Sequence, residues 1–249
     1  MILQCESVTK SFGALQAIRE LSFSVNEGEI FGIAGPNGAG KSVLFNLITH
    51  IPYGPTSGRI MFEGRPIQNK RPHDICRKGI ARSFQVPVFF SSMTILENVM
   101  IGAYFGKGKM FGVDQAEASK NALEALEFLG LADKKNIATA SMRVFDQKLL
   151  MIACCLATRP RLILLDEPMG GLNPAEVGQT MEIVRKIKTN GMTVVIIEHI
   201  MKALMGLSQR IMILDHGEKI AEGGPEDIAN DEKVLKAYLG EKIPHGDFK

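Results

Sequence analysis

A glycine-rich loop over residues 35–42 carries the clearest chemical signal in the sequence. It fits the pattern G-x-x-x-x-G-K-[ST] and reads, in order, Gly35, Pro36, Asn37, Gly38, Ala39, Gly40, Lys41 and Ser42. Such a loop needs glycine because backbone N–H groups must approach phosphate oxygens closely and because some positions require positive φ. The pattern predicts that Lys41 reaches the β- and γ-phosphates of a nucleoside triphosphate and that Ser42 offers its hydroxyl to Mg²⁺.

Two adjacent acids follow an apolar run much later in the chain. Asp166 and Glu167 come directly after residues 162–165, which read as a strand buried on both faces. Ligands of open α/β sheets bind beyond the carboxyl ends of the strands, so these acids are expected at the nucleotide. Asp166 would hold the metal through water, and Glu167 would polarise the attacking water as a general base. The alternative is an ordinary acidic turn.

Three more side chains lie where they could touch a bound nucleotide. His199 follows the apolar run 193–197 and could contact the γ-phosphate, although a single histidine at a strand end is usually structural. Gln85 ends a predicted strand over residues 80–85, and its amide could touch Mg²⁺ or the water; alone it would be an ordinary loop residue. Phe12 could stack on adenine, and core packing is an equal rival.

Hydrophobic periodicity indicates the elements that must position these residues. Residues 29–34 read as the strand before the loop, and residues 43–48 as the first turns of a helix whose N-terminus favours anions. Residues 2–8, 21–25 and 59–63 read as strands of a small antiparallel sheet. The sequence therefore predicts a phosphate-loop core with a small β subdomain.

The signals become helical after Gln85. Asp114 with Glu117 starts one helix and Gly130 stops it. A later helix, after the strand over residues 162–165, is expected to open at Asn173. The predicted organisation is one α/β domain, residues 1–249. Its core and antiparallel β subdomain would occupy about 1–86 and 159–249, with an inserted α-helical subdomain in about 87–158.

Composition narrows the class of function. The net charge is +2 and tryptophan is absent, so neither electrostatics nor base stacking argues for a nucleic-acid partner. The four cysteines lack C-x-x-C spacing, and Cys154 and Cys155 read as buried thiols in a reducing compartment. The longest apolar run, residues 149–157, is too short to cross a bilayer, and the N-terminus has no leader pattern. Any membrane connection is therefore expected to come through a partner.

Together these residues resemble the ATP-binding-cassette (ABC) ATPases of membrane transporters, in order and spacing over nearly the whole chain. The resemblance implies a P-loop NTPase (RecA-like) core that binds ATP and Mg²⁺. The positions that match the family's motifs are Phe12 for adenine stacking, residues 35–42 for Walker A, Gln85 for the Q-loop, Asp166 with Glu167 for Walker B and the catalytic acid, residues 170–173 for the D-loop, and His199 for the switch histidine. The implied metal ligands are Ser42, Gln85 and Asp166.

A narrower likeness is to the branched-chain amino acid uptake subfamily. The segments that carry it are residues 82–85, 93–99, 171–174, 197–199 and 238–241. Urea, amide and lipopolysaccharide-export ATPases are close relatives, so the transported solute is the weaker part of this likeness.

Two places depart from the family's pattern. Val43 stands where threonine usually follows the Walker A serine, which removes one hydroxyl near the α-phosphate. The signature motif, normally Leu-Ser-Gly-Gly-Gln before a helix, aligns with residues 142–147. Arg143 takes the serine position, and Val144 and Phe145 take the two glycine positions, so side chains stand where backbone should clasp the γ-phosphate of the opposite subunit. Arg143 could partly compensate by its charge.

The leading interpretation is the ATPase subunit of an ABC importer, peripheral on the cytoplasmic face of the membrane. It would work head-to-tail with a second, non-identical ATPase, because it keeps its own nucleotide-binding residues but lacks the signature that it lends. The rivals are an ABC ATPase of another system and a non-hydrolysing nucleotide-binding regulatory module. A small-molecule P-loop kinase would not explain Gln85, Glu167 and His199 together.

Apolar residues after Gln85 indicate where a permease could bind. Val88, Phe89 and Phe90 follow it directly, and the surface around residues 86–99 is predicted to dock a cytoplasmic helix of a permease. Packing inside the helical subdomain is the alternative for each of these side chains.

Overall fold

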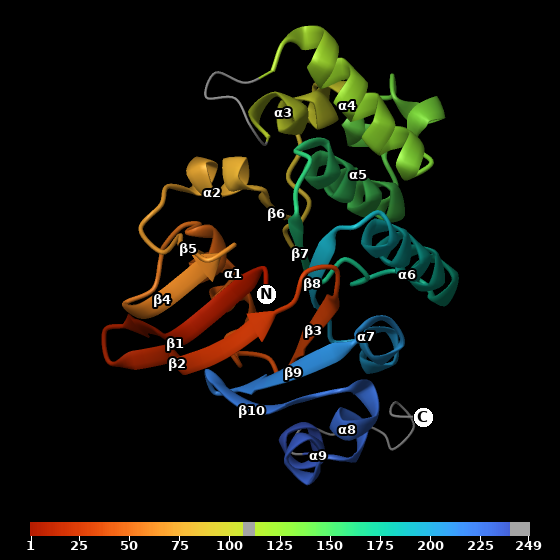
Figure 1. Ribbon diagram of the computed structural model, residues 1–249. Helices are drawn as coiled ribbons and strands as arrows, with labels where there is room; N and C mark the ends of the chain where they lie inside the picture. Colours follow the sequence, from red (N-terminus) through yellow and green to blue (C-terminus); the bar gives the residue numbers. More distant parts are fainter. Residues whose placement is uncertain (107–112, 240–249) are drawn as a thin grey trace. The chain divides into compact units, whose positions relative to one another are not determined.

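A computed structural model describes residues 1–106 and 113–239 of the chain. By compactness the chain divides into two units: the first holds residues up to Pro72 and those from Val184 onward, and the second runs from His73 to Ile183. Both units combine helices and strands, which confirms the predicted α/β class (Figure 1). The predicted boundaries of the helical subdomain, at residues 87 and 158, stay a prediction.

The first unit contains an antiparallel sheet with the strand order β2-β1-β4-β5. Its strands are β1 (Leu3–Phe12), β2 (Leu15–Val25), β4 (Ser57–Phe62) and β5 (Arg65–Pro66). Leu3 pairs with Val25 on one side and with Phe62 on the other, and all three side chains are buried. This confirms the predicted small sheet. β1 and β2 run longer than expected because they close into a hairpin at Gly13, whose φ is 59°.

The other sheet of the first unit runs in the order β10-β9-β3-β8. Its strands are β3 (Ile30–Ala34), β8 (Thr193–Ile197), β9 (Arg210–Asp215) and β10 (Glu218–Gly223). β3 is parallel to both β8 and β9, and every residue of β3 and β8 is buried, as expected for central parallel strands. The helices of this unit are α1 (Lys41–Thr49), α7 (Met201–Leu207), α8 (Pro225–Asn230) and α9 (Glu232–Leu239).

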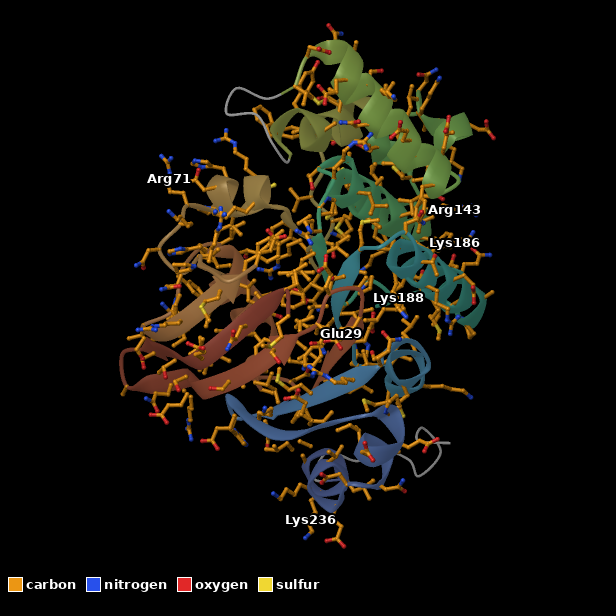
Figure 2. All side chains as sticks on the ribbon, viewed as in Figure 1. Glu29, Arg71, Arg143, Lys186, Lys188 and Lys236 are labelled. Carbon is orange, nitrogen blue, oxygen red and sulfur yellow. The ribbon has the colours of Figure 1, made fainter. Side chains whose placement is uncertain are left out.

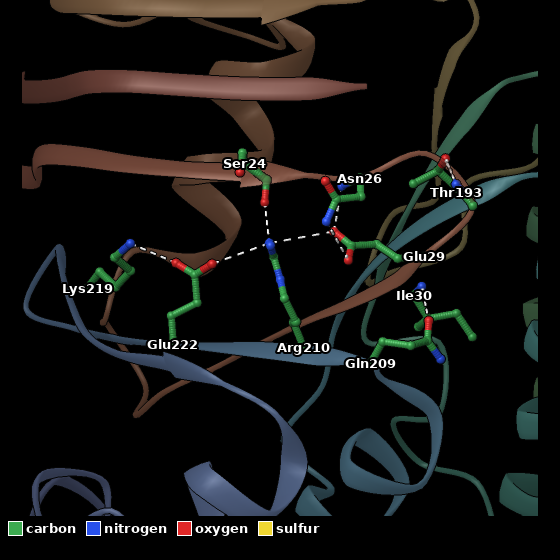
Figure 3. Close-up of polar contacts among 10 residues, drawn as sticks. Ser24, Asn26, Glu29, Ile30, Thr193, Gln209, Arg210, Lys219 and Glu222 are labelled. Atoms are coloured by element: carbon green, nitrogen blue, oxygen red, sulfur yellow. Dashed lines mark hydrogen bonds and ion pairs between the residues drawn. The ribbon is translucent and has the colours of Figure 1, made fainter. Parts of the chain in front are cut away.

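A polar network joins these two sheets around Arg210 at the start of β9 (Figure 3). The Arg210 guanidinium lies 3.5 Å from Glu29 and 3.3 Å from Glu222, and it donates to the backbone carbonyl of Ser24 in β2. Lys219 Nζ lies 2.7 Å from the other side of the Glu222 carboxylate. The charged groups of the network alternate in sign, so each one contacts a group of opposite charge. Through Arg210 the network connects β2 to the β9–β10 hairpin.

The second unit combines two parallel strands with a group of helices. The strands are β6 (Ile80–Arg82) and β7 (Leu162–Asp166). Helices α3 (Ile95–Phe105), α4 (Gln115–Phe128) and α5 (Val144–Ala157) contact one another and form the yellow-green to green group in Figure 1. The remaining elements are α2 (Pro72–Lys78), two short 3-10 turns at Ala132–Lys134 and Thr139–Ser141, and α6 (Pro174–Thr189), which begins in this unit and ends in the first.

Helix starts follow the predicted caps. Asp114 accepts a hydrogen bond from the Glu117 N–H at 2.8 Å and caps α4, and Asn173 accepts from the Glu176 N–H at 3.0 Å before α6. Helix α5 begins at Val144, inside the segment 142–147 that was predicted to precede a helix, because Arg143 already has the extended backbone of an N-cap.

Strand β6 is shorter than the predicted strand over residues 80–85. Its ladder ends at Arg82, and Ser83 then donates its N–H to Leu164 O at 2.9 Å and accepts from the Asp166 N–H at 3.2 Å through its Oγ. A side-chain oxygen thus replaces a ladder carbonyl, and the chain turns away from the strand. Gln85 consequently lies in a bend beyond the strand rather than at its end.

The cysteines are free thiols, and Cys5 and Cys155 are buried. Cys154 is partly exposed, so the predicted burial is confirmed for Cys155 and only in part for Cys154, whose thiol pKa is raised by desolvation to about 12. In the described part of the chain, none of the helices combines the length and the apolar character that a membrane span requires. The segment 238–241 lies partly outside the described residues.

Candidate functional site

The phosphate loop lies between β3 and α1 of the first unit, as predicted. Gly35, Gly38 and Gly40 have φ values of 148°, 81° and 102°, which L side chains rarely adopt. A Cβ on Gly35 would stand 1.9 Å from Leu214 O, and one on Gly40 would stand 2.7 Å from Ala17 O. Both glycines are therefore required by the packing of the first unit as well as by approach to a phosphate.

Lys41 begins α1 and turns back over the loop. Its buried side chain donates to Gly35 O at 2.6 Å and to Pro36 O at 3.0 Å. Ser42 follows in the first turn, which contains no acidic residue. The N–H groups and the positive end of the helix dipole therefore face the loop without a competing side-chain anion, an arrangement that favours phosphate.

Phe12 ends β1 with 43% of its surface exposed, so core packing does not account for it. Its ring meets the edge of Tyr53 at a centroid distance of 5.0 Å and an interplanar angle of 78°. Lys10 Nζ lies 5.1 Å from the Phe12 centroid and 4.6 Å from that of Tyr53. Tyr53 and Lys10 were not predicted from the sequence, although Lys10 is two residues before Phe12 and so shares its face of the strand.

His199 is exposed just beyond β8. Because β8 and β3 are parallel neighbours in register from Ile30 with Val194 to Ile33 with Ile197, His199 leaves the sheet at the edge where the phosphate loop begins. The first unit therefore places the histidine on the predicted side of its sheet.

Asp166 ends β7 in the second unit and is almost fully buried. Its Oδ2 accepts from Arg82 Nη2 at 2.9 Å, and the two side chains are 3% and 6% exposed. Arg82 balances the buried carboxylate and fixes its orientation. Arg82 was not predicted as a site residue from the sequence. Its position at the end of a strand, shortly before Gln85, is the feature that could have indicated it.

Glu167 and Gln85 meet directly in the second unit. Gln85 Nε2 donates to Glu167 Oε2 at 2.7 Å. Glu167 has a φ of 47°, a left-handed conformation that is uncommon for a residue with a side chain and that clusters at functional sites. The structure thus brings together two residues, 82 positions apart, that the sequence marked separately.

The signature positions lie at the N-terminus of α5. Arg143, labelled in Figure 2, is the N-cap and makes no side-chain capping bond, Val144 is 55% exposed, and Phe145 lies in the first turn. Asp146, also in this turn, accepts from Lys134 Nζ at 2.8 and 2.9 Å. A carboxylate of the same chain thus lies where the helix N-terminus would otherwise favour a phosphate.

An exposed apolar loop includes residues on both sides of Gln85. Phe84, Val86, Val88 and Phe90 are 40%, 70%, 79% and 58% exposed. Two hydrogen bonds fix the end of this loop at Phe90. The Asn98 side chain accepts one from the Phe90 N–H at 2.9 Å and donates the other to Phe90 O at 3.2 Å. Core packing therefore fails to explain Val88 and Phe90, whereas Phe89 is half-buried.

Comparison with known proteins identifies the family. The model "ABC transporter" matches residues 18–170, and "Branched-chain amino acid ATP-binding cassette transporter" matches residues 218–243. The branched-chain amino acid transport ATP-binding protein BraF of Pseudomonas aeruginosa is 36% identical over 96% of this chain and 98% of its own length. The branched-chain amino acid transport ATP-binding protein LivG of Escherichia coli is 35% identical over 96% of this chain and 98% of its own length.

Solved structures agree. An ATP-binding cassette of an ABC transporter in its ADP conformation has a TM-score of 0.88 and 33% identity, covering 96% of this chain and 99% of that one. The cassette cbiO1 of Clostridium perfringens has a TM-score of 0.82 and 26% identity, covering 96% and 95%. On this evidence the chain belongs to the ABC transporter family and has the P-loop fold of its ATP-binding cassettes, for which ATP hydrolysis is the expected activity.

Proposed function

We propose that this chain is the ATP-hydrolysing subunit of an importer of branched-chain amino acids or of related amino acids and amides. The observation that carries the proposal is the match of residues 218–243 to branched-chain amino acid cassettes, supported by the relation to BraF along nearly the whole chain. The phosphate loop alone would suit many NTPases, so the C-terminal match is what selects the transported class.

In this proposal the phosphates of ATP lie on the backbone of the loop, with Lys41 at the β- and γ-phosphates. Adenine stacks on Phe12, whose exposed ring is held from the side by Tyr53. The loop residues that surround the triphosphate are Gly35, Asn37, Gly38, Ala39, Gly40, Lys41, Ser42 and Val43.

The donors proposed for the metal suit Mg²⁺. They are the Ser42 hydroxyl, the Gln85 amide oxygen and, through water, the Asp166 carboxylate, and Mg²⁺ prefers such oxygen ligands. Gln85 uses its Nε2 toward Glu167, so a metal would be bound by the amide oxygen. When bound, Mg²⁺ neutralises charge on the β- and γ-phosphates.

Hydrolysis is assigned to the residues at the strand ends. Glu167 takes the proton of the attacking water, and Gln85 orients its carboxylate. Water forms a bond to the γ-phosphorus while the bond to the β–γ bridging oxygen breaks, which releases ADP and inorganic phosphate. Lys41 and His199 stabilise the charge that develops on the γ-phosphate.

A second, non-identical ATPase is the proposed partner within the transporter. This chain has every residue needed on its own side of a nucleotide, but the N-terminus of α5 presents Arg143, Val144, Phe145 and the paired Asp146. A homodimer would therefore contain two poor sites. A heterodimer would contain one competent site, built on this chain's loop and the partner's signature.

Permease subunits are the proposed membrane anchor, at the cytoplasmic face. The exposed loop of Phe84, Val86, Val88 and Phe90 supports this, because apolar side chains in a row on a surface mark an interface. Its pinned end at Asn98 would transmit force to α3.

The test is ATP-driven uptake by the complete transporter. The chain is reconstituted in liposomes with its permease subunits and second ATPase, and uptake of labelled leucine is compared with uptake of labelled urea. We expect leucine uptake that requires ATP and that is lost in Glu167→Gln. Uptake of urea alone would reassign the solute, and ATP binding without hydrolysis in the full assembly would favour a regulatory module.

A further inference from the structure

Lys148 is a buried cation inside the second unit, on α5. Its side chain is almost fully buried, and its Nζ donates to Gln85 O at 3.1 Å and to Glu167 O at 3.0 Å. Lysine is rarely buried, because its ammonium loses hydration that protein groups must replace. Here the replacement includes the main chain of Gln85, assigned to the metal, and of Glu167, assigned to the water.

Two of the hydrogen bonds of Lys148 go to the main chain of this pair of residues. Gln85 and Glu167 are 82 positions apart and are already joined by their side chains at 2.7 Å. Lys148 adds a second connection through their carbonyls, so the pair is held from both main chain and side chain. An ammonium suits this task, since it carries several donors on one atom.

Glu167 needs such a restraint. Its φ of 47° is a conformation that persists only where the surroundings hold it. Gln85 lies in a bend, beyond the end of the β6 ladder, so regular backbone pairing does not hold it either. Lys148 reaches both from a regular helix that packs against α3 and α4.

We propose that Lys148 is a positioning residue for ATP hydrolysis: by binding the carbonyls of Gln85 and Glu167 it holds the Glu167 carboxylate and the Gln85 amide in their mutual geometry. The inference rests on the proposed roles of Gln85 and Glu167. Lys148 touches neither nucleotide nor water in this scheme, so its removal acts on turnover and not on ATP affinity.

The test uses the complete transporter with Lys148→Met and Lys148→Arg. Lys148→Met keeps the length of the side chain and removes the donors, and we expect kcat to fall by about 10- to 100-fold, as for small misplacements of reacting groups, with KM and ATP affinity within about twofold. Lys148→Arg keeps a charged donor and should recover most of kcat. Equal loss in both variants, or a Lys148→Met transporter with parental kcat, would overturn the proposal.

Lys134→Met is the matched control, because Lys134 also ties down α5, through Asp146, but has no hydrogen bond to Gln85 or Glu167 among the described contacts. It should lower the melting temperature without the fall in kcat. A kcat loss as large as that of Lys148→Met would show that any loosening of α5 suffices, and would overturn a specific role for Lys148.

A combined variant separates this inference from the proposed function. If Lys148 acts through the Gln85–Glu167 pair, adding Lys148→Met to a transporter that already carries Gln85→Ala and Glu167→Gln leaves its single-turnover hydrolysis unchanged. A further 10-fold fall would overturn the inference while leaving Glu167 as the base. Parental turnover in Glu167→Gln would instead overturn the proposed base. If Lys148→Met does not assemble, Lys148→Gln replaces it. Because glutamine keeps an N–H donor, we expect a smaller fall in kcat, again with unchanged ATP affinity.

Discussion

Lys41 and Glu167 are each held by the backbone around them. Lys41 donates to the carbonyls of Gly35 and Pro36, so its ammonium stays over the loop. Glu167 has a left-handed φ of 47° and accepts from Gln85, which restricts its carboxylate. Groups that are ordered in advance lose less entropy when the reaction geometry forms. At the scale of residues, the chemistry therefore depends on charges whose positions are set by main-chain contacts.

Replacing Lys41 by alanine is expected to weaken ATP binding about 10- to 100-fold, because charge-assisted hydrogen bonds contribute about 1.5–3 kcal/mol. The measurement is a fluorescence titration with a labelled ATP analogue. Lys202→Ala, which removes an exposed lysine of α7, is the control and should bind as the parent does. Parental affinity in Lys41→Ala would disprove the role of the loop.

The neighbouring acids should separate into stability and catalysis. Asp166→Asn leaves Arg82 buried beside a neutral group and is expected to lower the free energy of unfolding by about 3 kcal/mol, seen by urea denaturation. The free energy of unfolding of Glu167→Gln should lie within about 0.5 kcal/mol of that of the parent. Its rate of ATP hydrolysis should fall about 10²- to 10⁴-fold, while its ATP affinity stays unchanged. Similar behaviour of the two variants would refute this division.

At the scale of elements, the start of α5 decides what this chain can offer another subunit. Val144 and Phe145 place side chains on the first turn of the helix. The Asp146 carboxylate, which accepts a hydrogen bond from Lys134, also lies in this turn. The same helix carries Lys148 a little further along, against Gln85 and Glu167. The start of α5 thus has no glycine at positions 143–145, which we aligned with the signature, while its next turn is bound to the proposed catalytic pair.

Restoring Ser, Gly and Gly at Arg143, Val144 and Phe145 should raise hydrolysis by the purified chain alone, which we expect to be slow in the parent. The gain is expected to reach about 10²-fold, since single transition-state donors contribute about that much. Alanine at the same three positions is the control, because it removes the side chains without freeing the backbone as glycine does. Brisk hydrolysis by the parent alone, or no gain on restoration, would contradict the heterodimer.

At the scale of the whole molecule, no membrane-spanning helix occurs in the described ranges, and an apolar loop remains uncovered on the second unit. Val88 is 79% exposed and Phe90 is 58% exposed, although both lie within a chain whose other large apolar side chains are mostly buried. The family is named for transporters, and an exposed apolar loop of this kind is typical of an interface, which supports the proposed permease contact.

Charged substitutions in this loop should uncouple transport from hydrolysis. Val88→Asp or Phe90→Asp is expected to lower uptake by about 10-fold or more, because burying an unpaired carboxylate at an interface is strongly unfavourable. ATP affinity should stay unchanged. Ile137→Asp, at a position 44% exposed elsewhere in the second unit, is the control for surface charge. Cross-links that place the permease away from Val88 would exclude this loop as the docking site.

Sequence alone determined the features that depend on neighbours along the chain. The glycines of residues 35–42 follow from backbone sterics and phosphate geometry, and the caps at Asp114 and Asn173 follow from N–H groups two or three residues away. Buried parallel strands such as β3, β7 and β8 were visible as apolar runs. These interactions are local, so residue type and spacing are sufficient to predict them.

Tertiary structure decided what depends on distant parts of the chain meeting. The hydrogen bond of Gln85 with Glu167 joins residues 82 positions apart, and the ion pair of Arg82 with Asp166 joins residues 84 apart. Lys148 was unremarked in the sequence, because a lysine in a helix is usually solvated and only folding buries its ammonium between two carbonyls. The exposure of Phe12 was equally undecided, since an aromatic ring at a strand end packs or stacks according to what the fold places beside it.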